Sequence, residues 1–345
     1  MSGNSELTNL NEIAGGAAAD SRRLFSADNS EIHSARVADV YLLKTRQILR
    51  AEHLDRTPVI ADIHASADGL FIGGQEVRRL LDGKQVTVRA LPEGERMAAG
   101  ETVMQLEGPY DEFGIHETAI LGILSSSSGW ATAAAECVRA AGNKPVACFA
   151  SRHLHPAAAP VMERAALIGG CSSASNILGA QLAGSQPVGT IPHALVLIVG
   201  DTLETAELYL KHLAGSGPLV CLVDTFRDEA EESVRVARAL GRDLYGVRLD
   251  TPGELGGVTP ELVARTREGL DGAGAGHVKI FCSGGMNPLR IPPLAAAGAD
   301  AFGVGSYISA ADPIDMTMDL KEISGKPIAK RGRTPGPAQN SRLVE

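Results

Sequence analysis

Short apolar runs alternate with helical patterns over the second half of the chain. The runs occupy residues 145–150, 167–168, 194–199, 219–223, 244–249, 278–281 and 301–304. Strands that alternate with helices pair in parallel, because each helix returns the chain to the same end of the sheet. The pattern therefore predicts an α/β fold in which residues 131–312 form an incomplete (β/α) barrel.

The first half of the chain has a different pattern. Four apolar stretches separated by turns, at residues 58–61, 69–73, 85–90 and 102–107, predict an antiparallel β region. Residues 91–101 look like the hairpin of a barrel-sandwich domain that carries biotin or lipoate, but the carrier lysine is replaced by Gln105. We therefore expect a barrel-sandwich-like β region without a carrier function. A helix from about residue 36 to 53 and a long one at 116–141 complete an N-terminal α/β domain, residues 36–130.

The two ends of the chain are less regular. Residues 1–35 are rich in Ser, Asn, Ala and Gly, and we expect a mobile or loosely docked arm there, without chemistry. Residues 313–345 include a basic stretch at 326–333, and we expect this segment to return to the N-terminal domain.

Composition excludes several classes of partner. The net charge of −9 disfavours nucleic acid and anionic membranes, so any phosphate site must be locally basic. No apolar run approaches the roughly 20 residues that span a bilayer, and the N-terminus lacks a signal-peptide pattern. Five widely spaced cysteines without a CxxC pair indicate reduced core thiols. We expect a cytoplasmic protein.

Two glycine-rich turns follow consecutive predicted strands near the end of the barrel. Residues 282–287 read Cys-Ser-Gly-Gly-Met-Asn, and residues 301–306 read Ala-Phe-Gly-Val-Gly-Ser. In (β/α) barrels the last two loops after strands commonly bind phosphate through exposed backbone N–H groups. Ionisable residues follow the earlier strands, at the same face where barrel enzymes gather their catalytic groups. The pattern predicts a cleft for a phosphorylated ligand.

An ordered set of motifs from about residue 36 to the C-terminus resembles the nicotinate phosphoribosyltransferase family, which is related to the quinolinate and nicotinamide phosphoribosyltransferases. The motifs are Asp-Val-Tyr at 39–41, Glu-Thr at 117–118, Phe-x-x-Arg at 149–152, Gly-Thr-x-Pro-His at 189–193, Asp-Thr-Phe at 224–226, Ser-Gly-Gly at 283–285 and Gly-Val-Gly-Ser at 303–306. The resemblance implies transfer of a phosphoribosyl group from phosphoribosyl pyrophosphate to nicotinate, giving nicotinate mononucleotide and pyrophosphate, with ATP as co-substrate in NAD biosynthesis or salvage.

The resemblance also implies roles for individual residues. Phe149 stacks on one face of the pyridine ring, and Tyr41 of a neighbouring subunit stacks on the other, so the protein is a homodimer or a ring of dimers. His193 accepts a phosphoryl group from ATP, a reaction that neutral imidazole can perform. The 5′-phosphate is held by the two glycine loops, through Ser283, Gly284, Gly285, Gly303, Gly305 and Ser306.

The chemistry of the remaining side chains fits the same reaction. The Arg152 guanidinium can pair with a carboxylate or a phosphate. His153 and His155 suit phosphate contacts, since no third residue with ligand spacing would complete a metal site. Asp224 and Asp250 can hold Mg²⁺ bound to pyrophosphate. Arg248 lies two residues before Asp250 and therefore shares a strand face with it. The two side chains either contact the ribose phosphate of the substrate together or form a closed ion pair with each other.

Several alternatives stay open. Quinolinate phosphoribosyltransferase shares the glycine loops, but the Arg-His-Leu-His-Pro segment at 152–156 is less basic than a dicarboxylate requires. Nicotinamide is a third candidate base, disfavoured because no aspartate lies at residues 171–173. A sugar-phosphate aldolase or isomerase barrel would need a strand lysine, for which Lys279 is the candidate. A non-catalytic phosphate-binding protein would not need so many ionisable residues at strand ends.

Overall fold

The computed structural model describes residues 6–13 and 24–345, and it divides the chain into two compact units. The first unit contains the residues up to Gly129 together with Asp312–Glu345, and the second contains Trp130–Ala311. Helix α5 (Glu117–Ala141) begins in the first unit and ends in the second. No helix of the described residues is long and apolar enough to cross a membrane.

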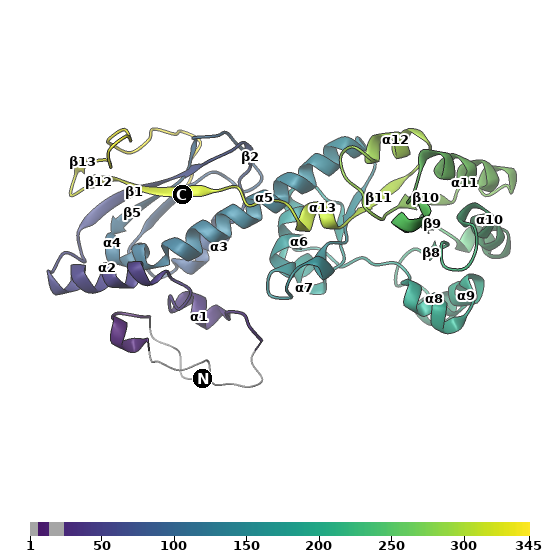
Figure 1. The fold of residues 1–345 in the computed structure, drawn as a ribbon, viewed down its shortest axis with the longest axis horizontal. Helices are drawn as coiled ribbons and strands as arrows, with labels where there is room; N and C mark the ends of the chain where they lie inside the picture. Colours follow the sequence, from purple (N-terminus) through teal and green to yellow (C-terminus); the bar gives the residue numbers. More distant parts are fainter. Residues whose placement is uncertain (1–5, 14–23) are drawn as a thin grey trace. The chain divides into compact units, whose positions relative to one another are not determined.

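A five-stranded antiparallel sheet forms the centre of the first unit. Its strand order is β13 (Lys326–Pro327), β12 (Met316–Ile323), β1 (Pro58–Ala65), β5 (Thr102–Pro109) and β3 (Thr87–Ala90). The blue strand β1 thus pairs with the yellow strand β12 from near the C-terminus (Figure 1). Ile63 lies opposite Met318 on β12 and Met104 on β5, and all three side chains pack in the core of this unit.

Short elements complete the first unit. A second, two-stranded sheet pairs β2 (Gly69–Leu70) with β4 (Arg96–Met97). The helices are α1 (Asn29–His33), α2 (Val40–Ala51), α3 (Gly74–Leu80) and α4 (Tyr110–Phe113), with 3-10 turns η1 (Leu10–Glu12) and η2 (Gly114–His116). Helix α3 lies between the predicted stretches 69–73 and 85–90, where the sequence pattern predicted only a turn. Its buried Val77 and Leu80 pack against the sheet core.

The arm predicted for residues 1–35 falls partly outside the described residues, but Glu6 within it makes specific contacts. Its carboxylate contacts Arg46 at 2.9 Å, Lys84 at 2.7 Å and His116 at 2.6 Å. Burial disfavours the charged form of Glu6, yet the hydrogen bonds from His116 and Lys84 and the charge of Arg46 outweigh it and lower the carboxyl pKa. Glu6 is therefore a charged anchor for this segment.

This anchor predicts a pH-dependent stability. A carboxyl whose pKa is lowered by folding stabilises the folded state above its ordinary pKa of about 4.5, and the contribution is lost as the pH falls through and below that value. A Glu6→Gln variant should be less stable than the wild type at pH 6. The difference in unfolding free energy between the wild type and the variant should be roughly 1 kcal/mol smaller at pH 4 than at pH 6. Urea unfolding at both pH values measures it, and an equal difference at the two would contradict the prediction.

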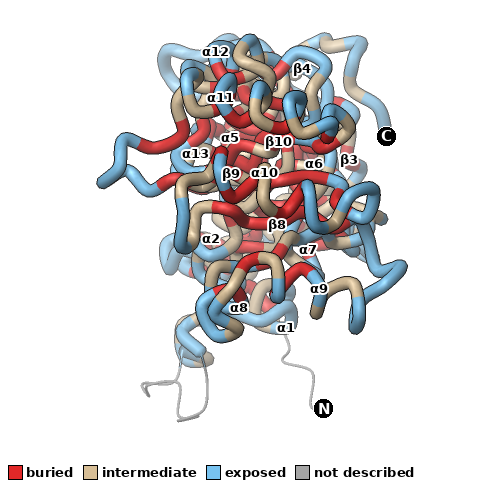
Figure 2. Tube along the Cα trace, turned by 90° about the vertical axis from the view of Figure 1, so that its right-hand side faces the viewer, coloured by how far each residue is buried: buried red, intermediate tan, exposed pale blue. Residues whose placement is uncertain are grey.

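Six parallel strands form the sheet of the second unit, in the order β7 (Ser173–Ala174), β6 (Val146–Cys148), β11 (Ala301–Val304), β10 (Lys279–Cys282), β9 (Gly246–Leu249) and β8 (Val220–Leu222). Edge strands β7 and β8 do not pair with each other in the described sheet, so the barrel is open. The strands are almost continuously buried, as parallel strands covered by helices are, and Figure 2 shows this burial along β8, β9 and β10. The predicted fold class, α/β with an incomplete barrel, is confirmed.

Helices of the second unit follow the strands. They are α6 (Ala159–Ile168), α7 (Ile177–Leu182), α8 (His193–Val199), α9 (Thr202–Leu213), α10 (Glu229–Leu240), α11 (Pro260–Gly272), α12 (Ile291–Ala296) and α13 (Ser306–Ser309), with 3-10 turns η3 (Ser151–His153), η4 (Gly241–Asp243) and η5 (Gly253–Leu255). Asp201, Asp228 and Thr259 cap α9, α10 and α11 through side-chain bonds to free N–H groups.

Two predicted strands in this unit are helical. Residues 167–168 end α6, and residues 194–199 lie in α8. The second run follows Pro192, which is the N-cap residue of α8, and only Val196 of that helix is buried. The strand of this region is instead the two-residue β7, which carries too few apolar positions to be recognised as a strand.

Candidate active site

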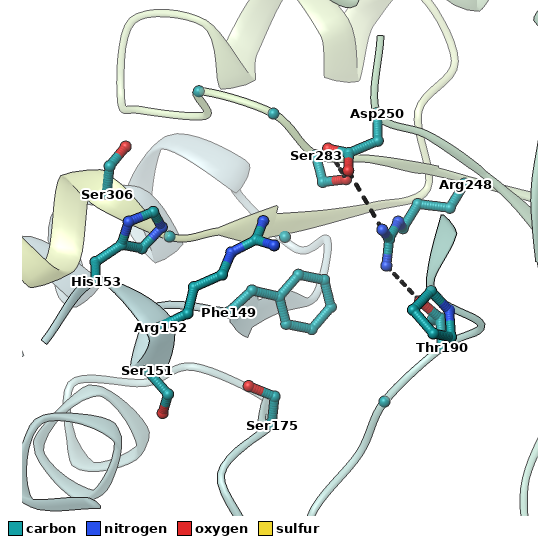
Figure 3. Close-up of a pocket in the computed structure, with 16 residues that line it drawn as sticks. Phe149, Ser151, Arg152, His153, Ser175, Thr190, Arg248, Asp250, Ser283 and Ser306 are labelled. Atoms are coloured by element: carbon teal, nitrogen blue, oxygen red, sulfur yellow. Dashed lines mark hydrogen bonds and ion pairs between the residues drawn. The ribbon is translucent and has the colours of Figure 1, made fainter. Parts of the chain in front are cut away.

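A pocket of about 430 Å³ lies in the second unit, where the strands end and their loops begin. Its lining comes from the loops after β6, β7, β9, β10 and β11 and from the segment before α8. The predicted residues that line it are Phe149, Arg152, His153, Arg248, Asp250, Ser283, Gly284, Gly285, Gly303, Gly305 and Ser306 (Figure 3). The carboxyl ends of the strands therefore bring most of the predicted residues together.

The two glycine loops need their glycines for different reasons. Gly284 and Gly285 have φ angles of 81° and 65°, a left-handed conformation that other residues adopt only with strain. Gly303 has no such angle, but a Cβ atom there would come within 2.5 Å of the Phe149 ring and 3.2 Å of Ser283. The first loop needs backbone freedom, and the second needs the empty space.

Gly303→Ala should test the packing of Phe149. The added methyl group would push the ring from its place, and overpacking of this kind costs about 1–3 kcal/mol. We expect the thermal midpoint of unfolding to fall by several degrees and the pocket to bind its ligand more weakly. Gly253→Ala is the matched control in the same unit, because a Cβ atom there meets nothing within 4 Å and the φ angle is ordinary. Equal melting of both variants would show that the Phe149 contact is not restrictive.

Two guanidinium groups face the pocket, and they differ in their partners. Arg248 donates to Thr190 and, at 3.3 Å, to Asp250, and it lies 5.9 Å from the Phe149 ring centre. Arg152, on the 3-10 turn η3, has no hydrogen-bond or ion-pair partner among the described residues, and it points into the pocket beside Phe149 (Figure 3). Arg152 is thus the guanidinium that is free to bind an anionic ligand.

Asp250 is held from two sides. Its Oδ2 accepts from Arg248, and its Oδ1 accepts from the Ser283 hydroxyl at 2.8 Å. Arg248 and Asp250 were predicted to share a strand face, and the bond between them agrees with that expectation. The result is an ion pair that also lines the pocket.

His193 and Asp224 form a pair next to this pocket. The Nε2 atom of His193 lies 3.0 Å from Oδ2 of Asp224, and the neighbouring Pro192 lines the pocket. Burial raises the pKa of Asp224, the charge of Asp250 adds to the rise, and the contact with His193 opposes it. The second oxygen, Oδ1, is buried without a partner in the described residues. Because Nε2 faces Asp224, Nδ1 is the imidazole nitrogen that this carboxylate leaves unoccupied.

The predicted magnesium ligands fit a metal held largely by its substrate. The described residues contain no cluster of three or more His, Cys, Asp or Glu side chains that could hold a metal ion. Mg²⁺ usually takes only one or two protein carboxylates and completes its shell with phosphate oxygens and water. The unpartnered Oδ1 of Asp224 and the pocket carboxylate of Asp250 are oxygen donors suited to such a site.

Besides His193 and Asp224, two more predicted residues lie outside the pocket. His155 accepts a hydrogen bond at Nδ1 from the backbone N–H of Ala157, so it closes a local turn before α6. Tyr41 lies on α2 in the first unit and is 56 % exposed. The Asp-Val-Tyr motif that contains Tyr41 contacts the Glu-Thr motif at 117–118. The Thr118 hydroxyl accepts a hydrogen bond from the Asp39 backbone N–H and donates one to the Asp39 carboxylate.

Several residues of the site had no individual role predicted from the sequence. Ser151, Ser175, Gly189, Thr190 and Pro192 also line the pocket. Behind it, Glu163 is fully buried on α6 and binds both serines. Arg290 donates to the carbonyls of Gly284 and Gly285 and so fixes the first glycine loop. The loop segments themselves were recognisable, but their supporting side chains lie on helices with no distinctive pattern.

Comparison with known proteins identifies the family. Residues 39–128 match the quinolinate phosphoribosyl transferase N-terminal domain, and residues 130–319 match the corresponding C-terminal domain. This chain belongs to the quinolinate phosphoribosyltransferase family. The resemblance inferred from the motifs is confirmed at this level.

Individual relatives of this chain carry two kinds of name. A nicotinate phosphoribosyltransferase of Mycobacterium tuberculosis is 33 % identical over 248 residues, which are 69 % of this chain and 54 % of that protein. The chain therefore spans about half the length of this relative. A crystal structure of nicotinate-nucleotide pyrophosphorylase from Pyrococcus furiosus is 43 % identical with a TM-score of 0.87, and the match covers 92 % of this chain and 82 % of that one.

A third relative is a probable carboxylating nicotinate-nucleotide pyrophosphorylase of Methanothermobacter thermautotrophicus. It is 25 % identical over 275 residues, which are 78 % of this chain and 91 % of that protein. The family is thus named for quinolinate, whereas these relatives are named for nicotinate or its nucleotide.

Proposed function

We propose that this protein transfers the phosphoribosyl group of phosphoribosyl pyrophosphate to nicotinate, with ATP hydrolysis coupled through His193. The observation that carries the choice of base is Arg152, a guanidinium without a partner in the described residues, beside the Phe149 ring at the centre of the pocket. An aromatic ring and one free guanidinium match a pyridine ring with one carboxylate. The other pocket guanidinium, Arg248, is already paired with Asp250.

In the proposed reaction the nitrogen of nicotinate attacks C1 of the ribose as the bond from C1 to pyrophosphate breaks. Pyrophosphate leaves with the electron pair of that bond, and no proton transfer is required. The residues therefore act by alignment and charge: Phe149 and Arg152 orient the base, and the glycine loops with Ser306 hold the 5′-phosphate. Bound Mg²⁺, held through Asp224 and Asp250, would neutralise charge on the departing pyrophosphate.

The coupling to ATP rests on the His193 and Asp224 pair. Asp224 orients the imidazole through Nε2, and the His193 side chain is 38 % exposed, so we expect Nδ1 to receive the terminal phosphoryl group of ATP. Transfer forms an N–P bond and releases ADP, and water later cleaves that bond to inorganic phosphate. Asp224 would stabilise the positive charge of the phosphorylated ring.

Quinolinate is the second candidate base, favoured by the name of the family whose two domains match this chain. Its reaction would release carbon dioxide as well as pyrophosphate. The shortage of unpaired cations at the base end of the pocket disfavours a dicarboxylate.

One assay tests these proposals. Purified protein is incubated with phosphoribosyl pyrophosphate, Mg²⁺ and nicotinate, nicotinamide or quinolinate, with and without ATP, and the nucleotide and carbon dioxide are measured. We expect nicotinate mononucleotide from nicotinate, formed faster with ATP. Nucleotide from quinolinate alone, with release of carbon dioxide, would reject the proposal in favour of the second candidate.

We also propose a homodimer or a ring of dimers in the cytoplasm, in which Tyr41 of one subunit completes the base site of another. The exposure of Tyr41 on α2 is compatible with this role. Gel filtration that finds an active monomer would contradict it.

A further inference from the structure

Glu163 is a buried carboxylate that the proposed reaction does not use. It lies on α6 with a fully buried side chain, and no lysine, arginine or histidine of the described residues pairs with it. A buried charge without an opposite charge is costly unless hydrogen bonds satisfy it. Glu163 has three of them. Its Oε1 accepts from the Ser151 hydroxyl at 2.7 Å and the Ser175 hydroxyl at 3.0 Å, and its Oε2 accepts from the Asn176 backbone N–H at 2.6 Å.

These bonds determine what the two serines can offer a ligand. A hydroxyl group has a single proton to donate, and an ionised carboxylate only accepts. Ser151 and Ser175 therefore donate their hydroxyl hydrogen bonds to Glu163. Toward the pocket, which both residues line, they present only oxygen lone pairs. We call Ser151 and Ser175, backed by Glu163, the serine wall. It is an acceptor surface with a negative charge behind it.

The position of the serine wall relates it to the base. Ser175 lies below Phe149 and Arg152 in Figure 3, at the opposite side of the pocket from Asp250 and Ser283. Under the proposed function, the single carboxylate of nicotinate pairs with Arg152. The remaining ring edge carries only C–H groups, which become more positive as the ring nitrogen forms its new bond, and acceptors tolerate them.

We propose that Glu163 is a positioning residue that sets the specificity of the base site by excluding a second carboxylate. The proposal rests on the proposed function. A second carboxylate at the ring edge, as in quinolinate, would meet two oxygen acceptors with no proton to give and the charge of Glu163 behind them. A site whose buried polar groups mismatch a ligand group discriminates strongly against it.

Glu163→Gln should reverse the polarity of the wall. The Asn176 N–H can only donate, so the glutamine must turn its carbonyl oxygen toward Asn176. Its amide nitrogen then faces Ser151 and Ser175 and donates to both, which frees their protons to point into the pocket. Donors would replace acceptors with almost no change in side-chain volume. Hydrogen bonds to a charged group then predict at least tenfold tighter binding of quinolinate.

The experiment measures binding and needs no turnover. Isothermal titration calorimetry gives the Kd of quinolinate and, separately, of phosphoribosyl pyrophosphate for the wild type, Glu163→Gln and Ser175→Ala. We expect quinolinate to bind Glu163→Gln at least tenfold more tightly than the wild type, while the Kd of phosphoribosyl pyrophosphate changes by less than about threefold. Unchanged or weaker quinolinate binding in a variant that still binds phosphoribosyl pyrophosphate would overturn the proposal.

Ser175→Ala provides a second test of the proposal in case the Glu163→Gln variant misfolds. It removes one acceptor without adding a donor, so quinolinate should bind a few-fold more tightly than to the wild type, but less tightly than to Glu163→Gln. If Glu163→Gln fails to fold, unchanged quinolinate affinity in Ser175→Ala overturns the proposal. Failure of the proposed function is a separate result, because it appears as absent nicotinate turnover in the wild type.

Discussion

Replacing Arg152 with alanine is expected to lower kcat/KM for nicotinate by about two to three orders of magnitude. The guanidinium has no partner among the described residues and lies beside Phe149, so a bound carboxylate would supply its missing charge-assisted hydrogen bonds. Losing one member of a desolvated ion pair costs about 2–5 kcal/mol, and each 1.4 kcal/mol corresponds to a factor of ten. Steady-state kinetics with nicotinate as the varied substrate measure the change.

Two further variants interpret that result. Arg152→Lys keeps the charge but loses the planar fork, so it should recover only part of the activity. Arg242→Ala is the control for a charge change elsewhere in the same unit, on the turn after α10 and away from the pocket. If Arg152→Ala instead raised KM for phosphoribosyl pyrophosphate and left nicotinate unaffected, Arg152 would serve the phosphates and the case for an acidic base would be lost.

Replacing His193 with alanine should abolish the coupling of ATP hydrolysis to product formation. Without the imidazole no phosphorylated enzyme can form, so nicotinate-dependent release of phosphate from ATP should fall at least a hundredfold, to the background rate. The slower formation of nicotinate mononucleotide in the absence of ATP should persist, because the pocket residues remain. Incubation with ATP labelled at the terminal phosphate should label the wild type in an acid-labile form and leave the variant unlabelled.

Asp224→Asn and His277→Ala sharpen this test. The amide of Asp224→Asn would stabilise a phosphorylated, positively charged ring less well than the carboxylate, so labelling should decrease without the loss of the nucleophile. His277 is a half-buried histidine of the same unit, away from the pocket, whose imidazole hydrogen-bonds the Gly241 carbonyl, and its replacement should leave coupling intact. Unchanged ATP stoichiometry in His193→Ala would refute the phosphohistidine.

The sequence predicted the barrel better than it predicted the site's supports. Parallel strands such as β8 and β11 are recognisable from their continuous apolar residues, and the loop that follows each one must lie at the pocket face. The strand predicted at residues 194–199 was wrong because a run of six apolar residues suits a strand and a buried helix equally. In the structure that helix leaves Leu197 and Ile198 exposed, which no local pattern announces.

The supporting contacts could not be inferred because they join residues far apart in the chain. His193 meets Asp224 across 31 positions, and nothing in either segment specifies the 3.0 Å contact. Glu163 lies in a short helix, and nothing in the sequence of that helix distinguishes its buried position from an exposed one. Its three partners belong to loops after two different strands, so only the folded arrangement reveals that it is satisfied.

The pairing of β1 with β12 has a consequence for synthesis on the ribosome. Strand β1 lies between β5 and β12, so one of its two hydrogen-bonded neighbours is separated from it by the whole of the second unit. The emerging chain must hold β1 with one edge open until residues 316–323 have left the ribosome, while the parallel sheet can already close. The contacts with the longest sequence separation form last and slow the overall rate. A chain stalled before Met316 would expose that edge to pairing with other molecules, so aggregation during expression should begin in the first unit.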